Sequence, residues 1–275
     1  MSPGTYQDYR GAGTALAEQA LLSVWDCLAD YHADLALVGG LAVRYLTHPP
    51  TGLGVGPVTI DVDFGISIGA SSGTFPKIEQ NLAEVGFRWV SGRFVRKIGG
   101  QNLFVDLLTD DGRSDTGTAV VDESLHAAIA PGIDRALAKV RVVEVAGNDL
   151  AGGPRRGRVR VAEVGPLLVL KLNAFAGRKD DKEGKDAHDI LYLAENYLDG
   201  VSQAVAGFQQ ERQAGNRGME RALHCLRTYF HDRDSDGPVA CAAFRLENRH
   251  WEATNQVESV KIRQACVTLA EALLA

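Results

Sequence analysis

The chain has few of the features that mark secreted, zinc-binding or membrane proteins. Four cysteines are scattered along 275 residues and none forms a Cys-x-x-Cys pair, so we expect free thiols and neither a disulfide framework nor a zinc site. The seven histidines include no pair at i and i+4. The first residues lack a basic segment followed by an apolar run, and no stretch is long and apolar enough to span a bilayer. We therefore expect a cytoplasmic protein with no signal peptide and no membrane partner.

The chain also has fewer basic than acidic residues. The formal net charge of −6 argues against a surface covered with cations for nucleic acid, although it allows a local basic groove. The strongest basic run, residues 154–160, contains four arginines: Arg155, Arg156, Arg158 and Arg160. This run could follow an RNA backbone, or it could be an ordinary solvated hairpin. The chain is long enough for one large domain or two small ones.

What the sequence does contain is a pair of carboxylates in a strand-like run, residues 58–66. On a strand, residues i and i+2 point to the same face, so Asp61 and Asp63 project together while Ile60, Val62 and Phe64 face a core. Two adjacent like charges repel unless a cation lies between them. Mg²⁺ (or Mn²⁺) suits such hard oxygen ligands, although a charged edge strand is the alternative.

A glycine pair precedes this run. Residues 35–38 predict a short buried strand, and residues 41–46 predict a helix that begins directly after Gly39 and Gly40. A strand, a glycine pair and a helix N-terminus expose backbone N–H groups that can hold a phosphate.

A third carboxylate lies within an apolar strand. Residues 87–90, 94–98 and 103–108 predict three strands joined by turns at Ser91-Gly92 and Gly99-Gly100. Asp106 lies in the last of them, and a buried Asp without a partner is costly. We place it beside Asp61 and Asp63 as a metal ligand and candidate base, although it could instead be a structural hydrogen-bond acceptor.

Lys171 lies in a predicted helix, residues 166–177, that is apolar almost all round. A buried ammonium needs an anion, and a triphosphate would serve; alternatively the lysine tip reaches water. In the next predicted helix, residues 183–198, Asp186 and Asp189 share a face. Their alternative explanation is the usual preference for acids near a helix N-terminus.

The remaining elements complete an α+β architecture. We expect a mixed-sheet core with flanking helices over residues 1–164 and a helical C-terminal domain over residues 165–275. The other predicted elements are a helix at 15–33, a loop at 47–57, a helix at 75–85, a hairpin of 141–145 with 158–162 joined by a loop at 147–157, and three or four helices after residue 200.

Four motifs in this order resemble the AbiEii/MenT-type nucleotidyltransferases, toxins of bacterial toxin–antitoxin systems within the DNA polymerase β-like superfamily. The motifs are Val38-Gly39-Gly40-Leu41-Ala42, Thr59-Ile60-Asp61-Val62-Asp63, Lys171, and Lys185-Asp186 with Asp189. The resemblance covers about residues 35–195, and its specificity comes from order and spacing because each motif alone is weak.

The resemblance implies a nucleotidyltransferase core in which the glycine pair contacts the triphosphate of an NTP. Asp61 and Asp63 would be metal ligands, Lys171 a phosphate contact, and Asp186 a further catalytic residue. Thr59 and Arg44 join the nucleotide-binding candidates. Two departures stand out: the loop before Asp61 is longer than usual, and Pro57 occupies a position where many relatives carry Arg, a contact that Arg44 would have to replace.

The sequence therefore predicts a metal-dependent nucleotidyltransferase whose acceptor is RNA, specifically a tRNA 3′ end, in a toxin role with an antitoxin as partner. The alternatives are nucleotidylation of a small molecule or a protein, and a non-catalytic nucleotide-binding module. The C-terminal domain is expected to carry Lys171 and Asp186 into the site.

Overall fold

The computed structural model describes residues 5–9, 12–47, 58–67, 78–122, 125–177 and 183–275, which fall into two units. The sheet unit comprises the described residues of 11–45 and 59–163, and the helical unit those of 1–10, 46–58 and 164–275. Each unit has its own core and is described by itself. The division of the chain into domains 1–164 and 165–275 stays a prediction, since the helical unit also includes two N-terminal stretches.

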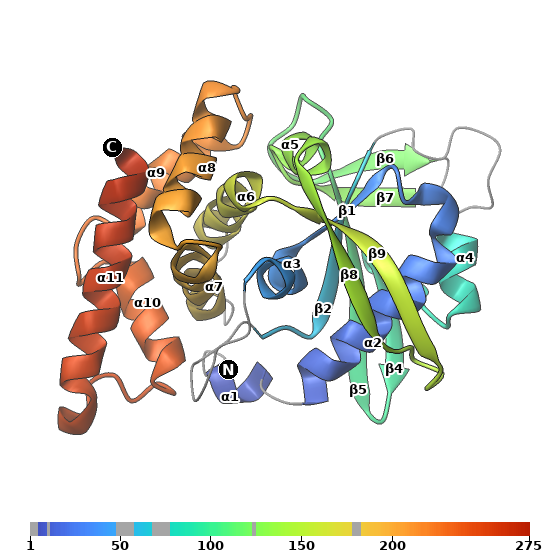
Figure 1. Ribbon diagram of the computed structural model, residues 1–275, viewed down its shortest axis with the longest axis horizontal. Coiled ribbons are helices and arrows are strands. Elements are labelled where there is room, and N and C mark those ends of the chain that lie inside the picture. Colours follow the sequence, from blue (N-terminus) through green and yellow to red (C-terminus); the bar gives the residue numbers. More distant parts are fainter. Residues whose placement is uncertain (1–4, 10–11, 48–57, 68–77, 123–124, 178–182) are drawn as a thin grey trace. The chain divides into compact units, whose positions relative to one another are not determined.

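A mixed sheet organises the sheet unit. Its strands run in the order β3-β4-β5-β2-β1-β9-β8, and β6 and β7 join it beside β5 (Figure 1). The bounds are β1 Leu35–Val38, β2 Asp61–Ile66, β3 Arg88–Val90, β4 Arg93–Ile98, β5 Gln101–Thr109, β6 Thr118–Asp122, β7 Leu125–Ile129, β8 Val140–Asn148 and β9 Pro154–Ala162. Strand β2 is antiparallel to β1 and parallel to β5, so the carboxylate motif lies inside the sheet with a neighbour on each side.

Helix α2 (Ala12–Cys27) covers one face of this sheet, and Trp25 stacks on Phe64 of β2 with ring centroids 5.9 Å apart. Its buried residues recur at helical spacing: Ala17, Ala20, Leu21, Val24 and Leu28 just beyond its end. The sheet unit also contains a 3₁₀ turn η1 (Ala29–Tyr31) and helices α3 (Gly39–Leu46), α4 (Ile78–Glu84) and α5 (Ile133–Ala138).

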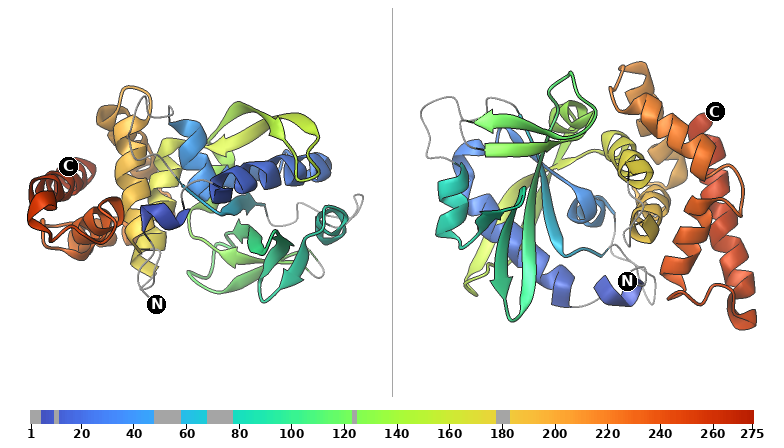
Figure 2. Two further views of the ribbon diagram at one scale, coloured as in Figure 1. Left: turned by 90° about the horizontal axis from the view of Figure 1, so that it is seen from below. Right: turned by 180° about the vertical axis from the view of Figure 1, so that it is seen from behind.

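The helical unit is built around α6, which contacts α7, α8 and α9, while α11 lies along α8 and α10 (Figure 2). Its elements are α1 Tyr6–Tyr9, α6 Val164–Gly177, α7 Glu183–Asn196, α8 Val201–Gln213, α9 Met219–Tyr229, α10 Asp236–Arg245, η2 Ala253–Asn255 and α11 Gln256–Leu274. Helices α6 and α8 approach so closely that a Cβ on Gly165 would overlap the backbone of Gly207. Only glycine allows this packing.

The predicted fold class is confirmed: a mixed sheet with flanking helices is followed by a series of helices. All four cysteines are free, as predicted. The predicted helix 15–33 is wrong at its end, because α2 stops at Cys27 and the short turn η1 follows. The predicted loop 147–157 is also wrong, because β8 and β9 pair as far as Asn148 and Pro154. Residues 48–57 of the predicted loop and residues 75–77 of the predicted helix lie outside the described residues.

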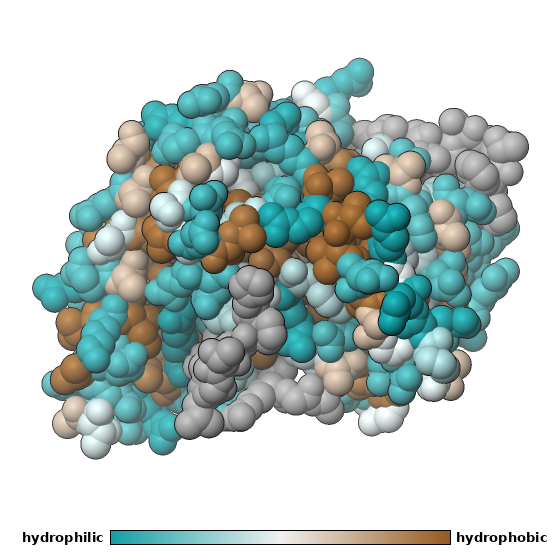
Figure 3. All heavy atoms as spheres, viewed as in Figure 1, coloured by the Kyte–Doolittle hydropathy of each residue, from teal (hydrophilic) through white to brown (hydrophobic). Residues whose placement is uncertain are grey.

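Hydrophilic residues occupy most of the face shown in Figure 3, and hydrophobic residues form separate patches among them. Within the described ranges, no helix has the combined length and apolarity that crossing a bilayer requires.

Candidate functional site

The register of two strands, β2 and β5, gathers Asp61, Asp63 and Asp106 on one face of the sheet, which we call the carboxylate face. Asp63 of β2 pairs with Asp106 of β5, and Asp61 pairs with Phe104 in the row below. Directly paired residues point to the same face of a sheet, as do residues i and i+2. The sequence predicted this grouping, and the register of the strands produces it.

The opposite face of the same strands is core. Val62 and Phe64 are fully buried, and Asp61 is 9% exposed while Asp63 is half-buried. The alternation is that of a strand with one apolar face against α2 and one polar face. The predicted orientation of Val62 and Phe64 toward a core is thus confirmed, whereas Ile60 is only half-buried and precedes the strand. Strand β2 is an internal strand rather than a charged edge strand.

Asp63 reaches the start of helix α3. Gly39, the first residue of α3, has φ +68°, and a Cβ at this position would overlap the carboxylate of Asp63. A left-handed φ and this close approach together require glycine. A carboxylate at a helix N-terminus is stabilised by the exposed N–H groups and the helix dipole. The Asp63 carboxylate therefore lies against the first residue of α3, and the contact of Gly39 and Gly40 with a triphosphate stays a prediction.

Asp106 is held by Arg93 of β4. The guanidinium makes a bidentate contact, with Nε to Oδ1 at 2.8 Å and Nη2 to Oδ2 at 2.5 Å, and Nη2 also lies 3.7 Å from Oδ2 of Asp61. The guanidinium lies 3.8 Å from the centroid of the Phe104 ring. A bidentate guanidinium–carboxylate contact is a strong, charge-assisted pair of hydrogen bonds. The candidate base is therefore paired with a cation in this conformation.

Arg93 was missed by the sequence analysis, although a signal for it existed. The turn at Gly99-Gly100 places Ile98 opposite Gln101, and the same register places Phe94 opposite Val105. One residue further along, Arg93 faces Asp106. The turn position alone therefore fixes this pair.

The two carboxylates of β2 suit a divalent cation by residue type and by their shared face. Both carboxylate oxygens of Asp106 accept hydrogen bonds from Arg93 in this structure. Among the described residues, no group of three or more His, Cys, Asp or Glu side chains is arranged to hold a metal ion. The ligand roles of Asp61, Asp63 and Asp106 remain predictions.

Thr59 and Arg44 make contacts that explain them structurally. The hydroxyl of Thr59 accepts a hydrogen bond from the N–H of Asp61 at 3.2 Å, and the Thr59 N–H donates to Oγ1 of Thr14, so Thr59 fixes the entry to β2. Nε of Arg44 donates to the carboxylate of Glu18 at 2.8 Å. Their nucleotide-binding roles stay predictions.

A second group of charges lies in the helical unit between α6 and α7. This buried charge cluster consists of Lys171, Lys185, Asp186 and Asp189. Nζ of Lys171 lies 3.2 Å from Asp186 and 2.6 Å from Asp189, and Nζ of Lys185 lies 2.8 Å from Asp189. The prediction that Lys171 is buried and needs an anion is confirmed, and its anions are protein carboxylates.

The structure bears on the alternative explanations for Lys171 and Asp186. Lys171 does not extend its tip to water, because its side chain is only 7% exposed. Asp186 does lie in the first turn of α7, as acidic residues often do, yet it also contacts Lys171. The roles of Lys171 in phosphate binding and of Asp186 in catalysis, and their placement beside the carboxylate face, stay predictions.

Charge neutralisation inside the cluster is strong. Burial raises the pKa of the Asp189 carboxyl, but Lys171 and Lys185 lower it more, so the pKa lies well below its ordinary value. Asp189 is therefore ionised in the folded protein across the neutral range.

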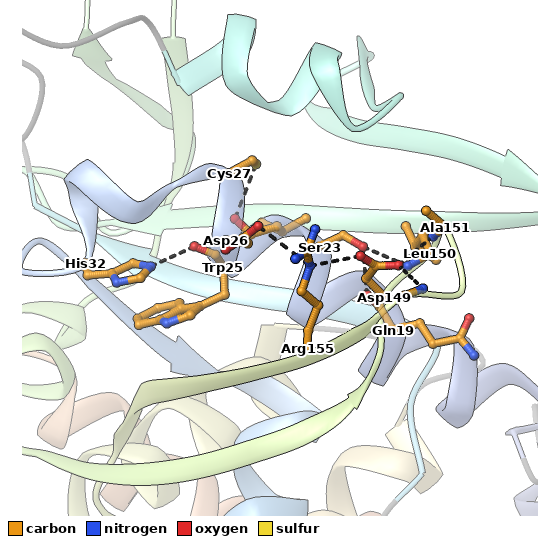
Figure 4. A network of polar contacts seen from close by, with 12 residues as sticks. Gln19, Ser23, Trp25, Asp26, Cys27, His32, Asp149, Leu150, Ala151 and Arg155 are labelled. Carbon is orange, nitrogen blue, oxygen red and sulfur yellow. Dashed lines mark hydrogen bonds and ion pairs between the residues drawn. The ribbon is translucent and has the colours of Figure 1, made fainter.

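The basic run is explained mainly by contacts within the sheet unit. Arg155 binds Asp149 at 3.0 Å, and Asp149 also accepts hydrogen bonds from the N–H groups of Ala151 and Gly153 (Figure 4). These bonds hold the turn between β8 and β9 and, despite some desolvation, lower the pKa of Asp149. The Oγ of Ser23 in α2 accepts a bond from the Leu150 N–H. Arg155 thus stabilises a turn.

Register also separates the basic run from Asp61. Strand β9 is parallel to β1 with Val161 level with Leu37, so Arg158 lies level with residue 34, whereas Asp61 lies beyond Val38 at the other end of β1. At about 3.3 Å per residue, Arg158 lies about 20 Å from Asp61 along the strands. Contact of this run with an RNA acceptor stays a prediction. Three further cations that follow Lys171 in the sequence lie outside the described residues: Arg178, Lys179 and Lys182.

Comparisons with known proteins add little. No protein-family model matches the chain, and no curated protein matches it. A solved structure that does match is described as an antigenic nucleotidyltransferase-like protein from Paracoccidioides brasiliensis. The match covers 74% of this chain and 93% of that chain, with 17% identity and a TM-score of 0.38. These values are too low to transfer a fold or a residue role.

Proposed function

We propose that the chain is a metal-dependent nucleotidyltransferase whose reaction takes place on the carboxylate face. The observation that supports this most is the shared face of Asp61, Asp63 and Asp106, with the N-terminal glycine of α3 against Asp63. Carboxylates beside an anion-binding helix start provide positions for a cation and for the phosphates that it accompanies.

In the proposed reaction, an acceptor hydroxyl attacks the α-phosphorus of an NTP, the bond to the β-phosphate oxygen breaks, and pyrophosphate leaves. Asp61 and Asp63 would hold Mg²⁺ (or Mn²⁺), which when bound supplies neutralisation of the charge on the phosphates. The N–H groups at Gly39 and Gly40 would orient the triphosphate. Asp106, once released by Arg93, would accept the proton of the attacking hydroxyl.

We further propose an RNA acceptor, a tRNA 3′ end, and a toxin role with an antitoxin partner in the cytoplasm. This finer proposal rests on the four-motif resemblance. The basic run does not strengthen it, because Arg155 is engaged in a turn and the run lies at the other end of the strands. Lys171 and Asp186 belong to the proposal as predicted phosphate contact and catalytic residue.

The test incubates the protein with each α-labelled NTP, Mg²⁺ and total tRNA, and follows both the label and released pyrophosphate. Label on RNA with one NTP supports the proposal. Asp61→Asn is the inactive variant, and Asp26→Asn is its matched control because Asp26 is an exposed carboxylate of the same unit on α2.

Other outcomes identify the alternatives. Label on protein or on a small molecule keeps the chemistry and replaces the acceptor. NTP binding without pyrophosphate release indicates a non-catalytic binding module. Absence of NTP binding with every base and with either metal ion contradicts the proposal.

A further inference from the structure

Arg93 contacts two of the three carboxylates of the carboxylate face, Asp106 and Asp61. Its side chain is 28% exposed, Asp106 is 24% exposed and Asp61 is 12% exposed, so the contact lies at the edge of solvent. Because water reaches both members, opening this pair costs less than opening a fully buried pair, even though its bidentate geometry makes it stronger than an ordinary surface ion pair. The pair can therefore separate when another ligand competes for either member.

The guanidinium also has a second anchor. It lies over the Phe104 ring at 3.8 Å from the centroid, and Phe104 is two residues from Asp106 on the same face. A cation over an aromatic face is attracted by the ring quadrupole, and Arg is the usual partner in such contacts. Phe104 can therefore hold the arginine on this face after its carboxylate contacts break.

The guanidinium of Arg93 can bind either of two kinds of anion. A guanidinium forms bidentate contacts with carboxylates and with phosphates alike. Asp61 and Asp106 suit either a guanidinium or a divalent cation, but one oxygen lone pair cannot serve both at once. Arg93 and a metal ion therefore compete for these carboxylates, while Arg93 and a nucleotide phosphate attract each other.

We propose that Arg93 is an exchangeable counter-ion of the carboxylate face. It neutralises Asp106 and Asp61 while they hold no divalent ion, and it moves to a nucleotide phosphate when they take one. The inference rests on the proposed function, and it adds that divalent-ion binding and nucleotide binding are coupled through this one side chain. Arg93 is a positioning residue in this scheme.

The test measures Mn²⁺ binding to the full-length protein by electron paramagnetic resonance, with and without a non-hydrolysable NTP analogue. Arg93→Gln removes the competitor, so we expect Mn²⁺ alone to bind about tenfold more tightly, the size of effect of one charge-assisted contact. With Mn²⁺ saturating, the analogue should bind more weakly to the variant than to the wild type. The two affinities thus change in opposite directions.

Lys97→Gln is the matched control. Lys97 is an exposed residue of the same strand, and it points to the same face of the sheet as Arg93. Its substitution by Gln removes one positive charge about 13 Å from Arg93. At that distance the surface field is largely screened by salt. Both affinities of Lys97→Gln should match the wild type. Equal shifts in the two variants would show a net-charge effect and overturn the inference.

Unchanged Mn²⁺ affinity in a folded Arg93→Gln protein with normal pyrophosphate release would also overturn it, and the proposed function would stand. If no variant and no wild-type protein binds Mn²⁺ in either condition, both fail. Should Arg93→Gln not fold, Arg93→Lys replaces it: lysine cannot form the bidentate contact, so Mn²⁺ should still bind more tightly than in the wild type, and equal affinity contradicts the exchange.

Discussion

The sheet and the helices each contain a cluster of opposite charges, and the two differ in how far water reaches them. On the carboxylate face, Arg93 and Asp106 are each about a quarter exposed. In the buried charge cluster, the side chains of Lys171 and Asp189 are 7% and 0% exposed. An exposed pair can exchange partners, whereas a buried pair whose ions are desolvated cannot lose one member without leaving an uncompensated charge.

The comparison shows that the charged residues of the four sequence motifs differ in their physical roles. The sheet cluster contains competing partners on an accessible face and suits binding. The helix cluster joins α6 to α7 inside the helical unit. Its ion pairs are made between protein groups, although Oδ1 of Asp189 is buried without a hydrogen-bond partner among the described residues, so we expect substitutions in this cluster to change stability first.

The largest difference in stability between the two clusters should come from removing the ammonium group of Lys171. Lys171→Met leaves Asp186 and Asp189 with less compensation in a buried site, so we expect unfolding to become easier by about 3–5 kcal/mol. Chemical denaturation of the variant and the wild type measures this. Lys261→Met is the control, because Lys261 is 69% exposed and its contact with Glu258 is 3.6 Å; it should change stability by less than about 0.5 kcal/mol. Equal effects would remove the contrast between the clusters.

Acid should affect the helix cluster in a defined direction. The folded-state pKa of Asp189 lies below its unfolded value, so its contribution to stability is complete above about pH 4 and is lost as pH falls through the folded pKa. Wild-type stability should therefore fall between about pH 4 and pH 2, and Asp189→Asn should show a shallower fall in that window. Parallel pH profiles of the two proteins would contradict the ionised state of Asp189.

Gly39 should be less tolerant than a glycine in an open turn. Gly39→Ala combines a left-handed φ with overlap on Asp63, for which we expect a loss of about 2–3 kcal/mol. Gly99→Ala is the control: Gly99 also has a positive φ, but nothing lies within 4 Å of the added Cβ, so about 1 kcal/mol is expected. Thermal melts measure the loss of stability in both variants, and the extra loss in Gly39→Ala is the cost of the overlap with Asp63.

The smallest effect should come from the basic run. Arg156 pairs with Glu144 at 3.7 Å, and the side chains are 72% and 66% exposed. Arg156→Ala should change stability by no more than about 0.5 kcal/mol. If chemical denaturation shows a larger loss of stability, solvent exposure does not decide how much an ion pair contributes to the stability of this protein.

Much of the site could be predicted because it depends on local rules. The period of a strand placed Asp61 and Asp63 together, and the apolar surroundings of Asp106 placed it nearby. The Arg93 contact followed from the hairpin turn and was available in the sequence, but it required counting the register outward from Gly99-Gly100. These relations need only neighbouring residues.

Other features depend on packing that no local pattern reveals. The burial of Lys171 was evident from its helix, yet the choice of Asp186 and Asp189 as its anions required the packing of α7 on α6. Strands β6 and β7 were missed because β7 is rich in alanine and its pairing with β5 involves only its last two residues. The length of β8 and β9 was missed because Asp149 and Arg155 hold the turn through side chains.

The central claim is that Asp61 of the carboxylate face serves the proposed nucleotidyl transfer, whereas Asp189 of the buried charge cluster serves the stability of the fold. One paired measurement tests it: pyrophosphate release and the midpoint of thermal unfolding for Asp61→Asn beside Asp189→Asn. We predict that Asp61→Asn loses pyrophosphate release and keeps a midpoint close to that of the wild type, because a metal ligand supplies several kcal/mol to the transition state, whereas Asp189→Asn lowers the midpoint. Near-wild-type pyrophosphate release by a folded Asp61→Asn protein would contradict the claim.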